Sequence, residues 1–369
     1  MAEWEQATIG DLCDSISDTY HGSDELVVLV NTSDVLEGKV LNHEPVENKN
    51  LKGQFKKTFQ KNDILYSEIR PANKRFAFVD FEDTDRYIAS TKFMVLRPRI
   101  DRVIPKFLFA ILKSQYMLDE LQLLAETRSG TFPQITFGSE LAPMPVMLPD
   151  IATQARIVSL LDTIEEKIDG NVQINDNLLQ QAQAIYCDMF ITNASPSWQL
   201  GHLSDLITVR YGKDHKKLAD GTYPVYGSGG IMRYVERPLY DKESVLIPRK
   251  GTLNNVMYVN EPFWSVDTMF FTEMKLPNVA KFVFHFVKSK DLASLNAGSA
   301  VPSMTTDILN AMELSIPDAD TFTKFEGIVA PMYHAIQQNT QESSKLAELR
   351  DSLLPRLMSG ELDVSDVEL

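Results

Sequence analysis

The chain contains 369 residues, of which 44% are hydrophobic and 24% are charged, and its formal net charge is −15. This length predicts two to four domains at about 100–200 residues per domain, and the 17 glycines and 18 prolines exclude a fibrous or disordered chain. The excess of acid argues against nucleic acid as a partner, because phosphate groups are bound through lysine and arginine.

Two further classes of protein are excluded by what the sequence lacks. No apolar run reaches the roughly eighteen residues that a membrane span needs, and the acidic N-terminal residues lack the apolar centre of a signal peptide. The two cysteines, Cys13 and Cys187, form neither a disulfide framework nor a cysteine zinc site. We therefore expect a cytoplasmic protein.

The first part of the chain, residues 1–150, predicts a globular domain of mixed α/β structure. Its β-rich segments are residues 63–69, 75–81 and 93–99, and polar turns separate them. A helix is predicted at about residues 104–125.

A long helix is predicted within the next segment, residues 151–195. Its apolar residues recur at alternating steps of four and three, which is the 3.5-residue period of a coiled coil. The predicted seam positions are Ile157, Leu161, Ile164, Ile168, Leu178 and Ile185.

A second globular domain of mixed α/β structure is predicted for residues 196–318, after a short linker at residues 194–197. Its β-rich segments are residues 244–249, 256–259 and 268–275, and its predicted helix spans residues 280–292.

A second long helix is predicted within the last segment, residues 319–369. Its seam positions are Phe325, Val329, Met332, Ile336, Leu346 and Leu353. Pro355 is predicted to kink or end this helix near Leu354, and Gly360 is the expected C-terminal cap.

The two halves of the chain repeat one another. Residues 157–190 and 325–358 align without a gap at an offset of 168, and KFLFAILKS before the first helix matches KFVFHFVKS before the second. The polar positions that the two helices share are Asn171 with Asn339 and Asn175 with Ser343. The predicted fold is therefore mixed α/β, with two globular domains and two coiled-coil helices in an internal repeat.

The patterns of catalytic and metal sites are absent or incomplete. The six histidines form no HxxxH or HxH pair, and the glycine-rich residues 222–230 lack both the GxGxxG and the GK[ST] pattern. Glu261 stands where the motif of adenine methyltransferases has a proline. Asp150, Glu165 and Lys167 fit the loose pattern of a metal-dependent nuclease, but a solvated helix face explains them better. We expect no catalytic residue and no metal site in this chain.

The negative charge is distributed unevenly along the chain. Segments 151–195 and 319–369 carry −4 and −5, whereas segment 1–150 carries −6 and segment 196–318 is neutral. The globular segments hold 30 of the 36 lysines and arginines. The acidity therefore does not exclude DNA, but it predicts that the chain alone binds DNA weakly.

Basic and amide side chains gather in a few loops of the globular segments. Residues 70–75 and 249–255 form basic turns at corresponding places, and the glycines within residues 128–132 and 223–230 let backbone N–H groups approach a phosphate. Arginine and asparagine read base edges, while lysine, serine and threonine hold phosphate. Solvated loops are the alternative. The candidate DNA-binding residues are Lys52, Lys56, Lys57, Arg70, Asn73, Lys74, Arg75, Arg128, Ser129, Thr131, Lys213, Lys216, Lys217, Tyr226, Ser228, Arg249, Lys250, Thr252, Asn254 and Asn255.

The order of these features resembles the specificity subunit of type I restriction–modification systems along the whole chain. Both long helices follow a Pro-Asp pair, at residues 149–150 and 317–318. The other segments that carry the resemblance are QARIV (154–158), LAELRDSLLPRLMSGEL (346–362), YPVYGSGG (223–230), RKG (249–251), FWSVDT (263–268), and VNTSDV (30–35) with Gly38. One departure is that the second helix begins TFTKF, without the usual Glu-Gln.

The resemblance implies two target recognition domains, separated by an antiparallel pair of helices, that read a bipartite asymmetric site in double-stranded DNA. It also implies two methyltransferase subunits and motor–nuclease subunits as partners, with adenine-N6 methylation as the modification. S-adenosylmethionine, ATP and Mg²⁺ are then expected in those partners, and this chain is not an enzyme. The residues leave two alternatives open, which are a coiled-coil scaffold that binds proteins and a stand-alone nuclease.

Overall fold

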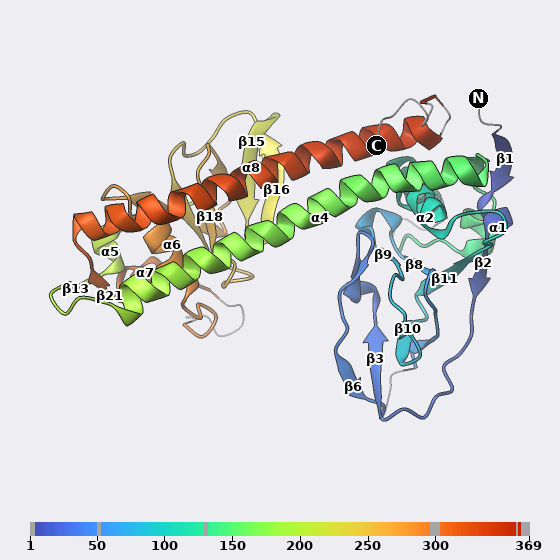
Figure 1. Ribbon diagram of the computed structural model, residues 1–369, viewed down its shortest axis with the longest axis horizontal. Helices are drawn as coiled ribbons and strands as arrows, with labels where there is room; N and C mark the ends of the chain where they lie inside the picture. Colours follow the sequence, from blue (N-terminus) through green and yellow to red (C-terminus); the bar gives the residue numbers. More distant parts are fainter. Residues whose placement is uncertain (1–3, 50–52, 129–131, 296–302, 359–360, 363–369) are drawn as a thin grey trace. The chain divides into compact units, whose positions relative to one another are not determined.

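The computed structural model describes residues 4–49, 53–128, 132–295, 303–358 and 361–362 (Figure 1). The chain divides into two compact units, one made of residues 1–170 and 341–369 and the other of residues 171–340. None of the helices in these described ranges is long and apolar enough to span a bilayer.

The first unit combines two four-stranded sheets with the helices α1, α2 and α3 and one end of each long helix. Its strands are β1 (Glu5–Thr8), β2 (Cys13–Ile16), β3 (Leu26–Val30), β4 (Val35–Leu36), β5 (Lys39–Val40), β6 (Pro45–Glu47), β7 (Phe55–Lys57), β8 (Ile64–Ser67), β9 (Phe76–Phe78), β10 (Tyr87–Ser90), β11 (Phe93–Pro98) and β12 (Pro145–Leu148). Its helices are α1 (Ile9–Leu12), α2 (Pro105–Lys113) and α3 (Gln115–Arg128), with short turns η1 (Thr32–Asp34), η2 (Pro71–Asn73) and η3 (Phe137–Leu141). The sheets have the orders β6-β3-β10-β7 and β2-β11-β8-β9, and β1 pairs with β12 and β4 with β5.

The second unit repeats part of this arrangement. Its strands are β13 (Gln199–His202), β14 (Ile207–Tyr211), β15 (Asp220–Gly227), β16 (Gly230–Val235), β17 (Ser244–Pro248), β18 (Met257–Val259), β19 (Trp264–Ser265), β20 (Met269–Met274) and β21 (Glu313–Ile316). Its helices are η4 (Asp188–Thr192), α5 (Leu203–Leu206), α6 (Ala280–Lys288) and α7 (Thr306–Asn310). The sheet β14-β20-β17-β18 has the same strand order as β2-β11-β8-β9, and β13 pairs with β21 as β1 does with β12. The repeat predicted from the sequence is thus present in the fold.

The predicted helices before the long helices are shorter than expected. The helix predicted at 104–125 is two helices, because Ser114 adopts an extended conformation that ends α2. Its hydroxyl accepts a hydrogen bond from the backbone N–H of Met117 at 3.3 Å, which helps α3 to begin anew. In the second unit α6 ends at Lys288, four residues early, and the chain turns where the N–H of Ser294 donates to the carbonyl of Asp291.

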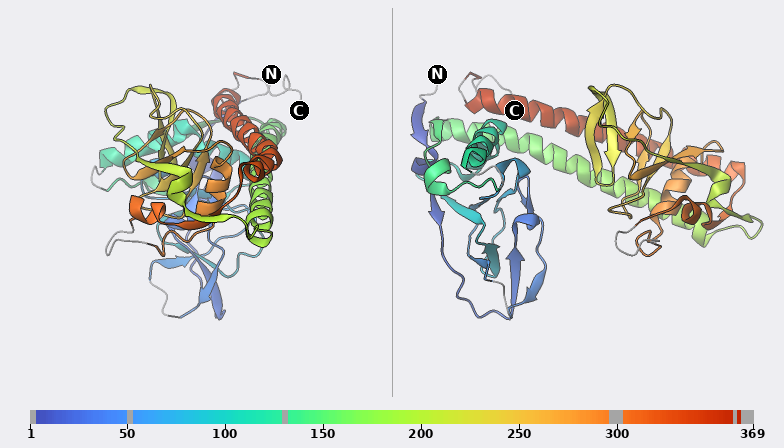
Figure 2. Two further views of the ribbon diagram at one scale, coloured as in Figure 1. Left: turned by 90° about the vertical axis from the view of Figure 1, so that its left-hand side faces the viewer. Right: turned by 180° about the vertical axis from the view of Figure 1, so that it is seen from behind.

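The two long helices are α4 (Ile151–Cys187) and α8 (Ala319–Met358), and they lie side by side in opposite directions within each unit (Figures 1 and 2). In the second unit the predicted polar layer joins them. The amide of Asn339 donates to that of Asn175 at 2.9 Å, and the amide of Asn171, which is buried, reaches the carbonyl of Asn339 at 3.4 Å. Such a buried polar layer fixes the register of two helices.

The predicted seam is only partly the buried face of the helices. Five of its residues are buried (Ile157, Leu161, Ile164, Phe325 and Val329), and seven are partly buried (Ile168, Leu178, Ile185, Met332, Ile336, Leu346 and Leu353). Near the end of α4 the large buried side chain is Tyr186, one residue beyond the predicted Ile185, and Phe190 is buried in η4, which follows. The reason is that α6 packs there, with the Phe282 ring 4.7 Å from that of Phe190. A 3.5-residue period identifies the residues that face the partner helix, but it does not identify those that face a third element such as α6.

Pro355 does not end α8 near Leu354, because the helix continues to Met358. A proline removes one backbone hydrogen bond, and here it stands in the last turn, where the helix is held by the buried side chains of Leu354 and Leu357. Gly360, the expected cap, lies outside the described residues.

A buried polar network joins α4, α6 and α8 in the second unit. The imidazole of His285 is fully buried, with Nδ1 2.7 Å from Gln183 Oε1 and Nε2 2.9 Å from the Tyr333 hydroxyl. Beside it the buried ammonium of Lys281 lies 2.9 Å from Glu243 and 2.7 Å from Glu326. Burial, followed by the charge of Lys288, lowers the pKa of His285 from 6.5 to about 4. The imidazole is therefore neutral at neutral pH.

This network predicts how the stability of the second unit depends on pH. The unfolded chain binds a proton at His285 below pH 6.5, whereas the folded unit resists it until about pH 4. The stabilisation is therefore complete above pH 6.5 and is lost as the pH falls toward 4. Between pH 7.5 and 4.5 we expect the wild type to lose about 2–3 kcal/mol more than His285→Gln does. Denaturation followed by tryptophan fluorescence in a Trp4→Phe background, which leaves Trp198 and Trp264, measures this. Equal losses in both proteins would contradict it.

Candidate nucleic-acid interface

The two basic turns predicted from the sequence occupy corresponding places in the two units. Residues 70–75 connect β8 to β9, and residues 249–255 connect β17 to β18. These strands hold the same positions in the two repeated sheets. Each turn therefore leaves its sheet at the same point of the fold.

The first turn is held in an unusual backbone conformation. Arg70 and Lys74 have φ angles of 45° and 52°, in the left-handed region that non-glycine residues rarely occupy. The N–H of Arg70 donates to the carbonyl of Pro133, and the N–H of Ala72 donates to the side chain of Gln122, both at 3.1 Å. Such strain persists only where the surroundings impose it, and it is common at functional sites. The side chains of Arg70 and Asn73 are exposed in this turn.

Other predicted cations of the first unit are engaged within it. The guanidinium of Arg75 donates to the carbonyls of Ser33 and Val35 at 3.2 and 3.0 Å, and the ammonium of Lys57 donates to the carbonyl of Phe93 at 2.6 Å. Lys74 pairs with Glu37 and Arg128 with Glu140, each at 3.3 Å. These side chains hold loops and helix ends in place.

The second turn is fixed from three directions. The N–H of Arg249 donates to the carbonyl of Thr268, and its own carbonyl accepts from the N–H of Met304, both at 2.9 Å. The amide of Asn255 donates to the carbonyl of Ser228 at 2.8 Å. Gly251 has a φ of 84°, and a Cβ there would lie only 2.8 Å from the Ser228 hydroxyl. The structure thus brings the predicted glycine-containing segment 223–230 next to the basic turn 249–255.

Arg249 rests on an aromatic side chain that the sequence reasoning missed. Its guanidinium lies 5.4 Å from the ring centroid of Tyr211, which is 53% exposed, and donates to the carbonyl of Asp267 at 3.2 Å. A stacked arginine keeps its charge while its orientation is restricted. The available signal was the position of Tyr211 at the end of a β-rich run, directly after Arg210.

The lysine-rich loop of the second unit, residues 213–217, is held by the same segment as Arg249, residues 264–268. The N–H of Lys213 donates to the carbonyl of Ser265, and the indole of Trp264 donates to the carbonyl of Lys213 at 2.9 Å. Segment 264–268 therefore carries the lysine loop on one side and the arginine turn on the other. The side chains of Lys216 and Lys217 are exposed there.

Apart from the engaged side chains described above, the predicted residues divide into three groups. Within the described residues, the exposed side chains without a hydrogen bond or ion pair are those of Lys56, Arg70, Asn73, Lys213, Lys216, Lys217, Lys250 and Thr252. The side chain of Asn254 bonds Asp291 and the N–H of Ala293, the Tyr226 hydroxyl donates to Glu261, and Ser228 is partly buried. Burial and the Glu261 charge raise the pKa of Tyr226 above its ordinary value. Lys52, Ser129 and Thr131 lie outside the described residues.

The residues of the nuclease alternative do not converge. Asp150 accepts a hydrogen bond from the N–H of Thr153 at 2.8 Å, which makes it the cap of α4. Glu165 lies fifteen residues further on, about 22 Å along the helix at 1.5 Å per residue, and pairs with Lys113. Lys167 pairs with Glu342. Among the residues that the structure describes, no group of three histidine, cysteine, aspartate or glutamate side chains is placed to hold a metal ion.

Comparison with known proteins assigns the chain to a family. The family described as "Type I restriction modification DNA specificity domain" matches residues 1–180 and 196–341. The type I restriction enzyme HindI specificity subunit of Haemophilus influenzae is 28% identical, over 98% of this chain and 100% of that protein. The MjaIX specificity subunit of Methanocaldococcus jannaschii is 20% identical, over 72% of this chain and 71% of that protein.

A solved structure shares the fold. The S subunit of the type I restriction–modification system from M. genitalium superimposes with a TM-score of 0.55 at 19% identity, over 97% of this chain and 96% of that one. The family match covers both repeated halves of this chain. The chain therefore belongs to the type I restriction–modification DNA specificity subunits.

Proposed function

We propose that this chain reads a bipartite, asymmetric site in double-stranded DNA in the cytoplasm, with one half-site for each globular segment. Residues 1–150 and 196–318 are the two target recognition domains in this proposal, and residues 151–195 and 319–369 are the helical spacer. The observation that carries it is the pair of basic turns at corresponding points of the two repeated sheets, each presenting exposed cationic or amide side chains. Because these turns differ in sequence, the two half-sites are expected to differ as well.

In this proposal, other subunits carry out the chemistry. Two methyltransferase subunits bind equivalent surfaces of the repeated helices, as near-twofold symmetry allows, and motor–nuclease subunits join them. The methyltransferases modify adenine N6 with S-adenosylmethionine, and the motor–nuclease subunits use ATP and Mg²⁺. This chain contributes specificity and no catalytic group.

The negative charge of this chain supports the expectation that it needs partner subunits to bind DNA tightly. The net charge is −15, and several of the candidate cations are already engaged by backbone carbonyls or carboxylates of the chain itself. DNA affinity depends on the number of phosphates that cations neutralise. We therefore expect tight binding only when partner subunits add positive surface.

Mapping of methylated adenines in cells that carry or lack this chain tests the proposal, together with gel-shift of the chain plus methyltransferase at low salt. The expected result is one bipartite motif that is methylated only when the chain is present. Methylation that does not depend on the chain, with no shift of duplex DNA, would instead favour a protein-binding scaffold.

A further inference from the structure

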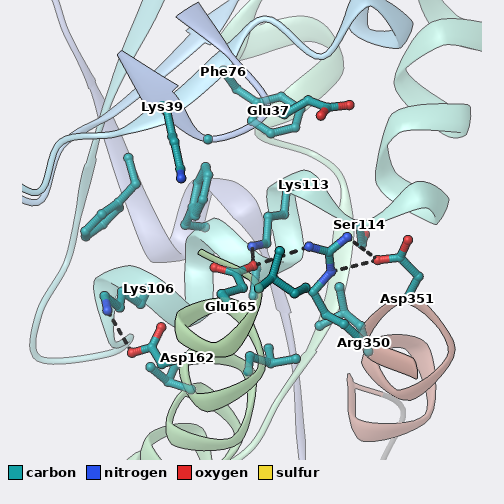
Figure 3. Close-up of a pocket in the computed structure, with 18 of the residues that line it drawn as sticks. Glu37, Lys39, Phe76, Lys106, Lys113, Ser114, Asp162, Glu165, Arg350 and Asp351 are labelled. Atoms are coloured by element: carbon teal, nitrogen blue, oxygen red, sulfur yellow. Dashed lines mark hydrogen bonds and ion pairs between the residues drawn. The ribbon is translucent and has the colours of Figure 1, made fainter. Parts of the chain in front are cut away.

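A charged cleft separates part of the first globular segment from the long helices in the first unit (Figure 3). Its volume is about 490 Å³, and it lies between α2, the β4–β5 hairpin and the paired segments of α4 and α8. Its apolar lining residues include Phe76, Phe109, Leu161 and Leu354. Its charged lining residues are lysines, an arginine and carboxylates.

One carboxylate at this rim joins three helices. Glu165 of α4 forms an ion pair with Lys113 of α2 and lies 3.8 Å from the guanidinium of Arg350 of α8 (Figure 3). Arg350 also pairs with Asp351, its neighbour on α8, at 2.8 Å. The side chain of Lys113 is only 18% exposed, so little water is available to replace Glu165.

Two further ion pairs cross the cleft. Lys106 of α2 lies 2.7 Å from Asp162, and Lys39 of the β4–β5 hairpin lies 2.8 Å from Asp169. Both carboxylates belong to α4, and the lysines of these pairs are 49% and 66% exposed, compared with 18% for Lys113. Exposed pairs contribute little individually and weaken with salt. Glu165 is therefore the contact across the cleft with the greatest expected effect.

The corresponding junction of the second unit, between α6 and the long helices, is built from different side chains. In the sequence repeat the corresponding residues are Lys113 and Lys288, Glu165 and Tyr333, Ala110 and His285, and Leu354 and Tyr186. Tyr333, His285 and Tyr186 of the second unit are larger than their counterparts in the first. All three are buried in the network around His285. The junction of the second unit is thus closed by buried side chains, and Lys281, the counterpart of Lys106, is buried between Glu243 and Glu326. In the first unit, partly exposed charges bridge an open cleft.

From this contrast we propose that Glu165 is a positioning residue, which fixes the first target recognition domain on the helix pair. The apolar contacts of α2 hold one side of this junction, and the Glu165 ion pairs close the other side. Without them the domain rocks on its apolar contact, and the position of its DNA-reading turn relative to the spacer becomes less definite. The part of this inference that concerns DNA rests on the proposed function.

Hydrogen exchange of the full-length chain tests, independently of DNA, whether the Glu165 ion pairs hold α2 against the helix pair. Glu165→Gln is compared with Glu166→Gln, a matched control that removes the same charge from an exposed neighbour with no ion pair among the described residues. We expect amides of α2 to exchange about fivefold faster in Glu165→Gln, the size of effect that a partly exposed ion pair gives. In the wild type, 0.5 M salt should have a similar effect on α2 and little effect on α6.

Lys113→Gln should reproduce the effect of Glu165→Gln, and the double variant should exchange no faster than either single variant. Equal exchange rates of the α2 amides in Glu165→Gln and Glu166→Gln, or α2 exchange that does not respond to salt, would contradict this role of the Glu165 ion pairs. So would a double variant whose effect is the product of the single effects.

Methylation by the complete complex tests the positioning role. Duplexes whose spacer between half-sites is one base pair shorter or longer than the native spacer are compared with the native site. In Glu165→Gln the preference for the native spacer should fall about fivefold, with little change in the maximal rate on the native site. Unchanged spacer preference despite faster exchange would overturn the positioning role. A complex that methylates no bipartite site would instead refute the proposed function and leave the exchange result standing.

Discussion

Replacing Phe325 by alanine should destabilise the second unit by about 3–5 kcal/mol, the cost typical of a buried phenylalanine. Phe325 is fully buried, and its ring lies 5.0 Å from that of Phe190 and 6.0 Å from the imidazole of His285. It joins α8 to the end of α4 and to α6. Truncation therefore leaves a cavity where three elements meet, beside polar groups that need a rigid frame.

Chemical denaturation of the Trp4→Phe chain measures this loss, since the remaining tryptophans lie in the second unit. The matched control is Ile328→Ala, three residues further along α8 and 41% exposed, for which a change within about 0.5–1 kcal/mol is expected. A loss below about 1 kcal/mol for Phe325→Ala would contradict the packing described for this junction.

Arg249→Ala should reduce discrimination at one base pair of the second half-site by about 1–3 kcal/mol, which is roughly 5- to 150-fold. The guanidinium is oriented by the Tyr211 ring and the Asp267 carbonyl before DNA arrives. An arginine held this way binds a guanine edge through two parallel hydrogen bonds. Removing it should therefore affect one position and leave the first half-site unchanged.

The measurement is kcat/KM of methylation by the assembled complex, on the native site and on sites with single changes in each half. Arg237→Ala removes the same charge from another exposed loop and should have little effect on discrimination. Tyr211→Phe keeps the ring and should retain most of the discrimination, whereas Tyr211→Ala should lose part of it. If Arg249→Ala weakens all sequences equally, Arg249 contacts phosphate and does not read a base.

The repeat could be predicted from the sequence because both copies kept the residues that pack. Phe107 and Phe282, at matching positions of the repeat, are both buried, as are Ile157 and Phe325. The buried face of α4 near Tyr186 could not be predicted, because it depends on a third element, α6, that lies about a hundred residues away. Periodicity within one helix carries no information about such a neighbour.

The positions of the two basic turns at corresponding points of the fold could be predicted from the sequence repeat. That these turns bind DNA stays a prediction, and which of their side chains remain exposed could not be predicted. Composition does not reveal, however, that Arg75 and Lys57 donate to carbonyls of their own unit while Arg70 remains exposed. Tyr211 could not be predicted because it carries no charge, and only the folded structure places its ring beside the Arg249 guanidinium.

If each globular segment reads its own half of one DNA site, exchanging one segment should change one half of the methylated motif. The experiment is to replace residues 1–150 by the corresponding segment of another specificity subunit and to map methylated adenines in cells. We expect one half of the motif to change, while the other half stays as it was. A change in both halves, or in neither, would contradict it.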